Sequence, residues 1–296
     1  MKDYAMTLHD FDLNFGTLEE RAVQYNARAS VADFDACVAE YAELAGEAKR
    51  QCPGIYDLAY GPGIAERLDL FPVTRDRQPA PVFVFIHGGY WRSQSKEDAP
   101  LMAKAFTDQG IAVCTLEYTL LPEATLAETV REVRSAIAWL YRNAAAYGID
   151  PQRIHVGGSS AGGHLAAMLG AAGWQERFGL PNDVIKGVLS LSGLHDLRPL
   201  CDIYINEWLR LYPDQAERLS PLFQLPAAGT PVVLSVGGLE TEGFKRQTYA
   251  YEAACRQQGL NVRRVEAPQC NHFNLLSELN DPKSALSRAC FEMILG

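Results

Sequence analysis

The feature that most constrains the fold of this chain is a Gly-Ser-Ser-Ala-Gly pentapeptide at residues 158–162, which fits the pattern G-x-S-x-G. Residues 153–157 before it are typical of a short strand, and residues 164–169 after it are typical of a helix. The small residues of the pentapeptide permit a sharp turn that lifts the hydroxyl of Ser160 out of the sheet. Ser160 is therefore the candidate nucleophile, and Ser159, at a variable position of the pattern, is interpreted as a turn residue.

A serine hydroxyl becomes an effective nucleophile only when a base takes its proton and hydrogen-bond donors stabilise the resulting oxyanion. The apolar run 82–86 is typical of a strand buried on both faces, and it leads directly into His-Gly-Gly-Tyr-Trp at 87–91. This segment resembles the oxyanion loop of esterases and lipases with the α/β-hydrolase fold. We therefore expect the backbone NH groups of Gly88 and Gly89 to bind a substrate oxygen, together with the NH group of Ala161.

The general base is expected late in the chain, because the order in this fold is serine, acid, histidine. His272 meets this condition, since it lies in a loop that follows a predicted strand at 261–265. His195 precedes the expected acid. His155 and His164 are assigned to packing or supporting roles, because their positions five residues before and four residues after the nucleophile do not suit a base.

The acid of the triad is expected directly after the strand and exit turn predicted at 231–238. The first carboxylate beyond that strand is Glu240, and Glu242 follows it. The acid must hold the histidine in the correct tautomer and stabilise the imidazolium that forms. Glu240 is the predicted acid, and Glu242 is the alternative.

Composition agrees with a single enzyme domain. The chain has 296 residues and is 48% hydrophobic, which is enough to bury a large core. Its net charge of −9 argues against nucleic acid or an anionic membrane as a partner. No basic segment followed by an apolar core opens the chain and no long apolar run follows, so we expect a cytoplasmic protein. Seven scattered cysteines without C-x-x-C spacing predict reduced thiols and no metal site.

Strand and helix patterns alternate along most of the chain, as a mostly parallel sheet requires. Strands are predicted at 111–116 and 184–191, and residues 126–147 have apolar positions at helical spacing. We expect one domain, residues 1–296, with a central sheet covered by helices on both faces. Residues 1–55 are interpreted as a helical N-terminal extension, and residues 195–225 as a small cap-like insertion over the active site.

Motifs along nearly the whole chain resemble the arylformamidase (kynurenine formamidase) group of α/β-hydrolases. They are Tyr25-Asn26-x-Arg28, residues 59–63, 68–71, 87–91, 192–200 and 219–221, Asn206, and Phe244 with Gln247. The resemblance implies a metal-independent serine hydrolase that acts on formamides or aryl esters without a cofactor, with Ser160, Glu240 and His272 as the triad. This chain departs from the family at the acid, which is typically aspartate and is glutamate here.

The expected reaction is acyl transfer through Ser160 to water, on a small aromatic amide or ester. Tyr90, Trp91, Trp208 and Phe273 are predicted to form an aromatic substrate pocket. Two alternatives remain: a carboxylesterase or thioesterase with the same machinery, and a non-catalytic binding protein with this fold. The chain is expected to be a monomer or a homodimer.

Overall fold

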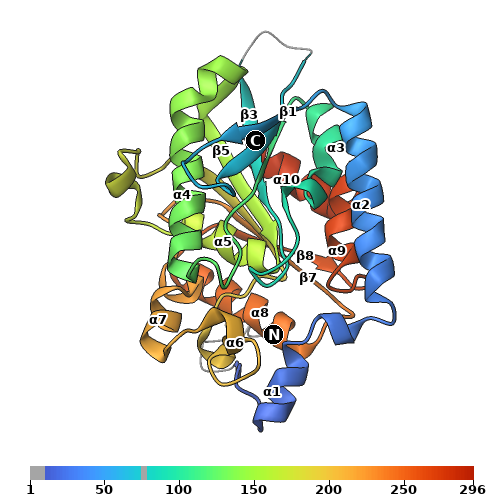
Figure 1. Ribbon diagram of the computed structural model, residues 1–296, viewed down its shortest axis with the longest axis vertical. Helices are drawn as coiled ribbons and strands as arrows, with labels where there is room; N and C mark the ends of the chain where they lie inside the picture. The colour runs from blue at the N-terminus through green and yellow to red at the C-terminus, as the bar shows by residue number, and fades with distance from the viewer. Residues whose placement is uncertain (1–10, 75–78) are drawn as a thin grey trace, which may run out of the picture.

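The computed structural model describes residues 11–74 and 79–296. A twisted sheet with the strand order β1-β2-β4-β3-β5-β6-β7-β8 runs through its centre (Figure 1). The strands are β1 (Ile55–Ala59), β2 (Arg67–Phe71), β3 (Ala80–Ile86), β4 (Ala112–Leu116), β5 (Ile149–Ser159), β6 (Ile185–Leu191), β7 (Val232–Gly237) and β8 (Val262–Ala267). Strand β2 is antiparallel to β1 and to β4, and the pairings from β4 to β8 are parallel. The predicted α/β-hydrolase fold with a mostly parallel sheet is confirmed.

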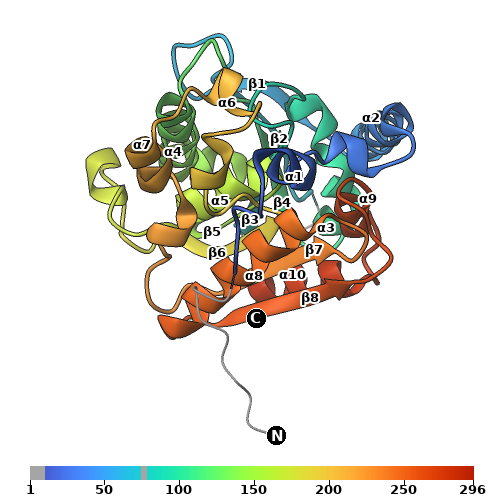
Figure 2. The ribbon, with the colours of Figure 1, turned by 90° about the horizontal axis from the view of Figure 1, so that it is seen from below.

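Helices cover both faces of the sheet (Figure 2). On one face, α3 and α10 meet through Phe106 and Phe291, whose ring centroids are 5.0 Å apart. On the other face, α5 and α8 share a hydrophobic cluster, and α4 packs beside α5. The helices are α1 (Leu18–Gln24), α2 (Phe34–Gln51), α3 (Ala103–Thr107), α4 (Leu126–Asn143), α5 (Ala161–Gly170), α6 (Asn206–Leu209), α7 (Pro213–Arg218), α8 (Glu242–Gln257), α9 (Asn274–Ser277) and α10 (Ala285–Leu295).

The local sequence explains why the main elements form where they do. All seven residues of β3 are buried, as expected for a continuous apolar strand covered on both faces. Helix α4 begins with a capping box, in which Thr125 and Glu128 each accept a hydrogen bond from the other's backbone NH group. Its apolar residues at helical spacing, Val130, Val133 and Ile137 among them, are buried against the sheet.

The first two strands were not predicted. Four of the five residues of β1 are exposed, so the strand has no alternating apolar pattern from which it could be recognised. Strand β2 carries Asp69 among buried residues, and this carboxylate is paired with Lys96 Nζ at 2.8 Å. Because Asp69 interrupts the apolar run and its partner lies 27 residues away, the local sequence does not indicate a buried strand here.

The topology brings the loops that follow β3, β5, β6, β7 and β8 to one edge of the sheet. Parallel strands direct their carboxyl ends to the same side, and ligands of open α/β sheets bind there. The loop at 87–91 follows β3, Ser160 follows β5, Glu240 follows β7 and His272 follows β8. In the part of the chain that the structure describes, no helix is long and apolar enough to cross a membrane.

Three buried histidines are expected to make the stability of the fold depend on pH. Burial lowers the pKa of His155 to about 4, of His164 to about 4 and of His195 to about 3, from an ordinary value of 6.5. Below pH 6.5 the unfolded chain therefore binds protons that the folded chain does not. Stability should be complete above pH 6.5 and fall as the pH is lowered toward 4, with each histidine contributing up to about 1.4 kcal/mol per pH unit.

Urea unfolding at pH 7, 6 and 5 measures this dependence, in a range where carboxylates of ordinary pKa stay ionised. His155 lies just past the middle of β5, and His155→Gln should reduce the slope while preserving the fold. An unfolding free energy that is constant from pH 7 to pH 5 would contradict the prediction.

Candidate active site

Ser160 lies at a strained turn between β5 and α5. Its backbone has φ 58° and ψ −119°, a conformation that side-chain-bearing residues rarely adopt. Its NH group donates to the carbonyl of Leu191 at 2.8 Å, which ties the turn to β6. A Cβ at Gly162 would lie 2.0 Å from the carbonyl oxygen of Ile86, and one at Gly158 would lie 2.3 Å from Gly162. Glycine is therefore required at both positions for the close approach of β5, α5 and β3.

The His-Gly-Gly loop after β3 passes directly over this turn. A Cβ at Gly88 would lie 3.4 Å from the Cβ of Ser160, and both Gly88 and Gly89 line the same cavity as the serine. Gly89 has φ 88°, and a Cβ there would meet the carbonyl oxygen of Ser93 at 2.1 Å. Among the described residues, no acceptor takes a hydrogen bond from the NH groups of Gly88, Gly89 or Ala161. Gly88 and Gly89 line the cavity, whereas Ala161 is fully buried and is not among the lining residues.

Side chains on neighbouring segments support the loop. His87 stacks on Tyr118 with ring centroids 4.3 Å apart, and its Nε2 lies 3.0 Å from Glu117 Oε1. Further along the loop, Trp91 is fully buried and its Nε1 donates to Nδ1 of His164 at 3.3 Å. The other nitrogen of His164 lies 2.7 Å from the carbonyl of Leu219. These contacts hold the loop in one position relative to α5.

Glu240 and His272 meet at the end of β7. Glu240 Oε2 lies 2.6 Å from His272 Nδ1, and both side chains are buried. The other carboxylate oxygen, Oε1, accepts hydrogen bonds from the Ser192 hydroxyl at 2.5 Å and from the Gly237 NH group at 2.7 Å. The carboxylate is thus satisfied by three partners, and it faces the imidazole with a fixed oxygen. Glu242, the alternative acid, instead pairs with Lys245 at 3.2 Å on the surface.

His272 and Ser160 line one cavity of about 750 Å³. The Ser160 hydroxyl makes no hydrogen bond to any other residue that the structure describes. Catalytic hydrogen bonds are commonly long in ligand-free enzymes and shorten when substrate binds. The arrangement brings together a buried serine that lines the cavity, an imidazole held by a buried carboxylate, and the backbone NH groups of Gly88 and Gly89.

Three of the four aromatic residues predicted for the substrate pocket line this cavity, namely Tyr90, Trp208 and Phe273. Trp208 is held by a hydrogen bond from its Nε1 to the carbonyl of Tyr90 at 3.1 Å. Trp91 is the exception, because its backbone φ of 58° turns the indole into the core against His164, away from the cavity. Its contact with the cavity is therefore indirect, through the loop that it anchors.

Several residues of the site were missed by sequence reasoning. Phe34, Val38 and Tyr41 of α2 line the cavity, and the Tyr41 hydroxyl donates to the carbonyl of Phe273 at 2.6 Å. Ser192, the donor to Glu240, has φ 48° directly after β6. Its place at the carboxyl end of a central strand is a signal that could have identified it. No sequence signal connects α2 to a loop more than 200 residues away.

No group of three histidine, cysteine, aspartate or glutamate side chains within residues 11–74 and 79–296 is placed to hold a metal ion. The described cysteines are all free thiols. Cys270, two residues before His272, is buried, and burial raises the pKa of its thiol. A raised pKa leaves little thiolate at neutral pH, so this cysteine is a poor nucleophile.

Comparison with known proteins places this site in a family. The BD-FAE family model matches residues 68–234, more than half of the chain. Kynurenine formamidase of Salmo salar is 28% identical over 246 residues, which are 81% of this chain and 82% of that protein. Esterase LipQ of Mycobacterium tuberculosis is 27% identical over 77% of this chain and 59% of its own length. A crystal structure of a candidate thioesterase from Silicibacter sp. tm1040 has a TM-score of 0.79 and 29% identity, and the match covers 94% of this chain and 99% of that one.

The matched segment runs from β2 to β7 and includes the His-Gly-Gly loop and the turn at Ser160. The relatives named above are hydrolases by name, and their matches extend over most of this chain. The chain belongs to the BD-FAE family, and it is an arylformamidase-like α/β-hydrolase.

Proposed function

We propose that this protein is a serine hydrolase that cleaves formamides or aryl and short-acyl esters through an acyl-enzyme on Ser160. The observation that carries the proposal is the Glu240–His272 contact at 2.6 Å beside the cavity that His272 shares with Ser160. A carboxylate at this distance from Nδ1 keeps the proton on that nitrogen, so Nε2 is free to accept the serine proton.

In the proposed reaction, Ser160 Oγ attacks the carbonyl carbon while His272 Nε2 takes the hydroxyl proton. The carbonyl oxygen becomes an oxyanion, which the NH groups of Gly88, Gly89 and Ala161 stabilise. The bond to the leaving amine or alcohol then breaks, and His272 returns the proton to that group. Water, deprotonated by His272, then attacks the acyl-enzyme. The bond between Ser160 Oγ and the acyl group breaks, His272 returns the proton to Ser160, and the carboxylic acid is released.

An aromatic leaving group fits the lining of the cavity. Phe34 and Phe273 meet edge to face with centroids 5.2 Å apart, and Tyr204 and Trp208 form a second aromatic pair. Such walls favour planar apolar groups. The similarity to kynurenine formamidases supports an N-formyl arylamine as substrate. We also infer that the N-terminal extension, 1–55, and the insertion, 195–225, act as a cap, because both contribute residues to the cavity.

A panel of three acyl donors with the same aromatic leaving-group skeleton tests the proposal: an N-formyl arylamine, an aryl acetate and an aryl thioacetate. The formamidase proposal expects the highest kcat/KM for the N-formyl compound relative to its uncatalysed rate. Activity confined to the ester and thioester would support the second candidate, an esterase or thioesterase. That candidate is favoured by the similarity to the Silicibacter protein over nearly all of both chains.

A further inference from the structure

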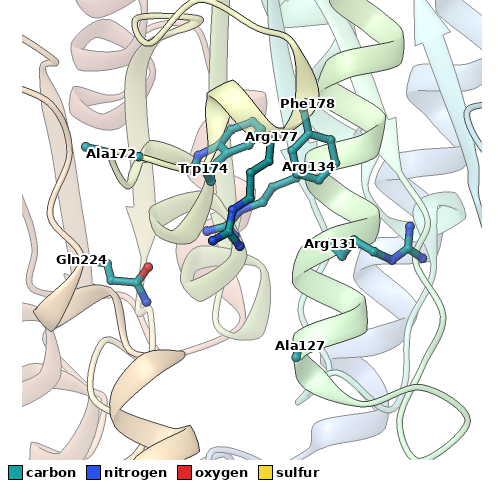
Figure 3. A pocket seen from close by; sticks show the side chains of 9 residues that line it. Ala127, Arg131, Arg134, Ala172, Trp174, Arg177, Phe178 and Gln224 are labelled. Atoms are coloured by element: carbon teal, nitrogen blue, oxygen red, sulfur yellow. The ribbon is translucent and has the colours of Figure 1, made fainter.

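A second cavity, of about 550 Å³, lies between α4 and the segment that follows α5 (Figure 3). It is formed by the first half of α4, by residues 172–178 after α5, and by Gln224. It shares no lining residue with the cavity that contains Ser160. The catalytic proposal therefore makes no use of it.

Three arginines line this cavity, and two of them turn into it. Figure 3 shows the guanidinium groups of Arg134 and Arg177 directed toward the same space, whereas Arg131 points away. Arg131 lies 3.6 Å from Glu66 and 3.6 Å from Glu132. Within the described parts of the chain, no carboxylate lies within 4.0 Å of Arg134 or Arg177. The two inward groups form an uncompensated pair of positive charges in a protein whose net charge is −9.

Arg134 is held in position before any ligand binds. Its guanidinium lies over the ring of Trp174, 5.3 Å from the centroid, and one of its NH₂ groups donates to the carbonyl of Met168 at 3.3 Å. Trp174 is fixed in turn by a hydrogen bond from Nε1 to the carbonyl of Leu169 at 3.0 Å. The Nε atom of Arg134 is buried and has no partner among the described residues. Burial and the neighbouring Arg177 lower the pKa of Arg134 to about 10, so the charge is costly where it stands.

We propose that this cavity binds a phosphate group, either as inorganic phosphate or on a small phosphate monoester. A phosphate dianion neutralises both uncompensated charges, and guanidinium groups present NH donors in the fork geometry that phosphate oxygens accept. The unpartnered Nε of Arg134 gains an acceptor. A carboxylate monoanion would leave one positive charge unpaired. Trp174 and Phe178 give an apolar wall for an organic group attached to the phosphate.

Thermal unfolding at constant ionic strength tests this proposal, because a ligand that binds only the folded state raises Tm by an amount set by the ratio of its free concentration to its Kd. The probes are inorganic phosphate, phenyl phosphate and acetate. We expect Tm to rise with the logarithm of the concentration of the two phosphates above their Kd, and to stay unchanged with acetate. Arg177→Gln should weaken phosphate binding about tenfold or more, because a charge-assisted hydrogen bond is lost. Arg177 is exposed, so this variant should fold even where Arg134→Gln does not.

Arg288→Gln is the matched control. Arg288 is an exposed arginine on α10, on the opposite face of the sheet, with no ion pair among the described residues. The Arg288→Gln variant should show the same increase in Tm with phosphate as the wild type. Tighter binding of phenyl phosphate would identify the ligand as a monoester, and equal binding would identify it as inorganic phosphate. Equal increases in Tm for wild type and Arg177→Gln, an equal effect of acetate, or no effect of phosphate on the wild type would overturn the proposal.

Discussion

Ser160→Ala is expected to reduce kcat on an activated aryl ester by roughly 10⁵-fold or more, with the folded structure intact. The hydroxyl is the proposed attacking group, and we do not expect the neighbouring Ser159, which ends β5, to replace it. Alanine lacks only the hydroxyl oxygen. Like serine it has a Cβ, so it adopts the strained φ of 58° at about the same cost. Initial-rate kinetics, with circular dichroism and a thermal melt as checks on folding, measure the effect.

Ser159→Ala is the matched control, because Ser159 is the neighbouring buried serine and ends strand β5. It should retain turnover within about tenfold, a scale set by small shifts in the geometry of the site. The double variant Ser160→Ala with His272→Ala should lose no more than the more damaging single variant, since the two residues act as a unit. Near wild-type turnover by Ser160→Ala would contradict the assignment.

Glu240→Gln is expected to lower kcat by roughly 10⁴-fold, the scale known for loss of a triad carboxylate's charge. Two donors, the Ser192 hydroxyl and the Gly237 NH group, meet at Oε1 of Glu240. In the glutamine variant the amide oxygen must occupy that position, so the NH₂ group faces His272 Nδ1. The imidazole then accepts at Nδ1 and carries its proton on Nε2, where it cannot take the proton of Ser160.

Glu242→Gln provides the comparison for this prediction. Glu242 begins helix α8, is exposed, and contacts Lys245 at 3.2 Å. An exposed pair of this kind contributes little to stability, so the variant should have near wild-type kinetics. Steady-state kinetics of the two variants, measured at the same pH, separate the carboxylates. A crippled Glu242→Gln with an active Glu240→Gln would show that the acid has been misassigned.

An element of the fold could be predicted where its own residues form a recognisable apolar pattern, and could not be predicted where it depends on contacts with distant residues. The buried parallel strands are visible as apolar runs, and α4 is visible from its apolar positions at helical spacing. Strand β1 is exposed and β2 contains a charged residue whose partner, Lys96, lies beyond β3. Those two strands depend on tertiary contacts, which a local pattern does not contain.

The residues of the candidate site also differ in whether the local sequence predicts them. The turn at Ser160 and the Gly88–Gly89 loop have short motifs, because close backbone approach demands glycine at particular positions. Trp91 adjoins that loop in sequence, but its positive φ directs the indole into the core. The wall that Phe34 and Tyr41 contribute comes from a helix at the other end of the chain, and only the folded structure reveals it.

The role of Ser160 as the nucleophile is tested by identifying the residue that reacts with a serine-directed aryl phosphonate. The protein would be inactivated with the reagent, digested and mapped by mass spectrometry, with Ser160→Ala treated in parallel. We expect one adduct per chain, on Ser160, formed at the rate at which activity is lost and absent from Ser160→Ala. An adduct on Ser159, or inactivation without modification of Ser160, would contradict this role.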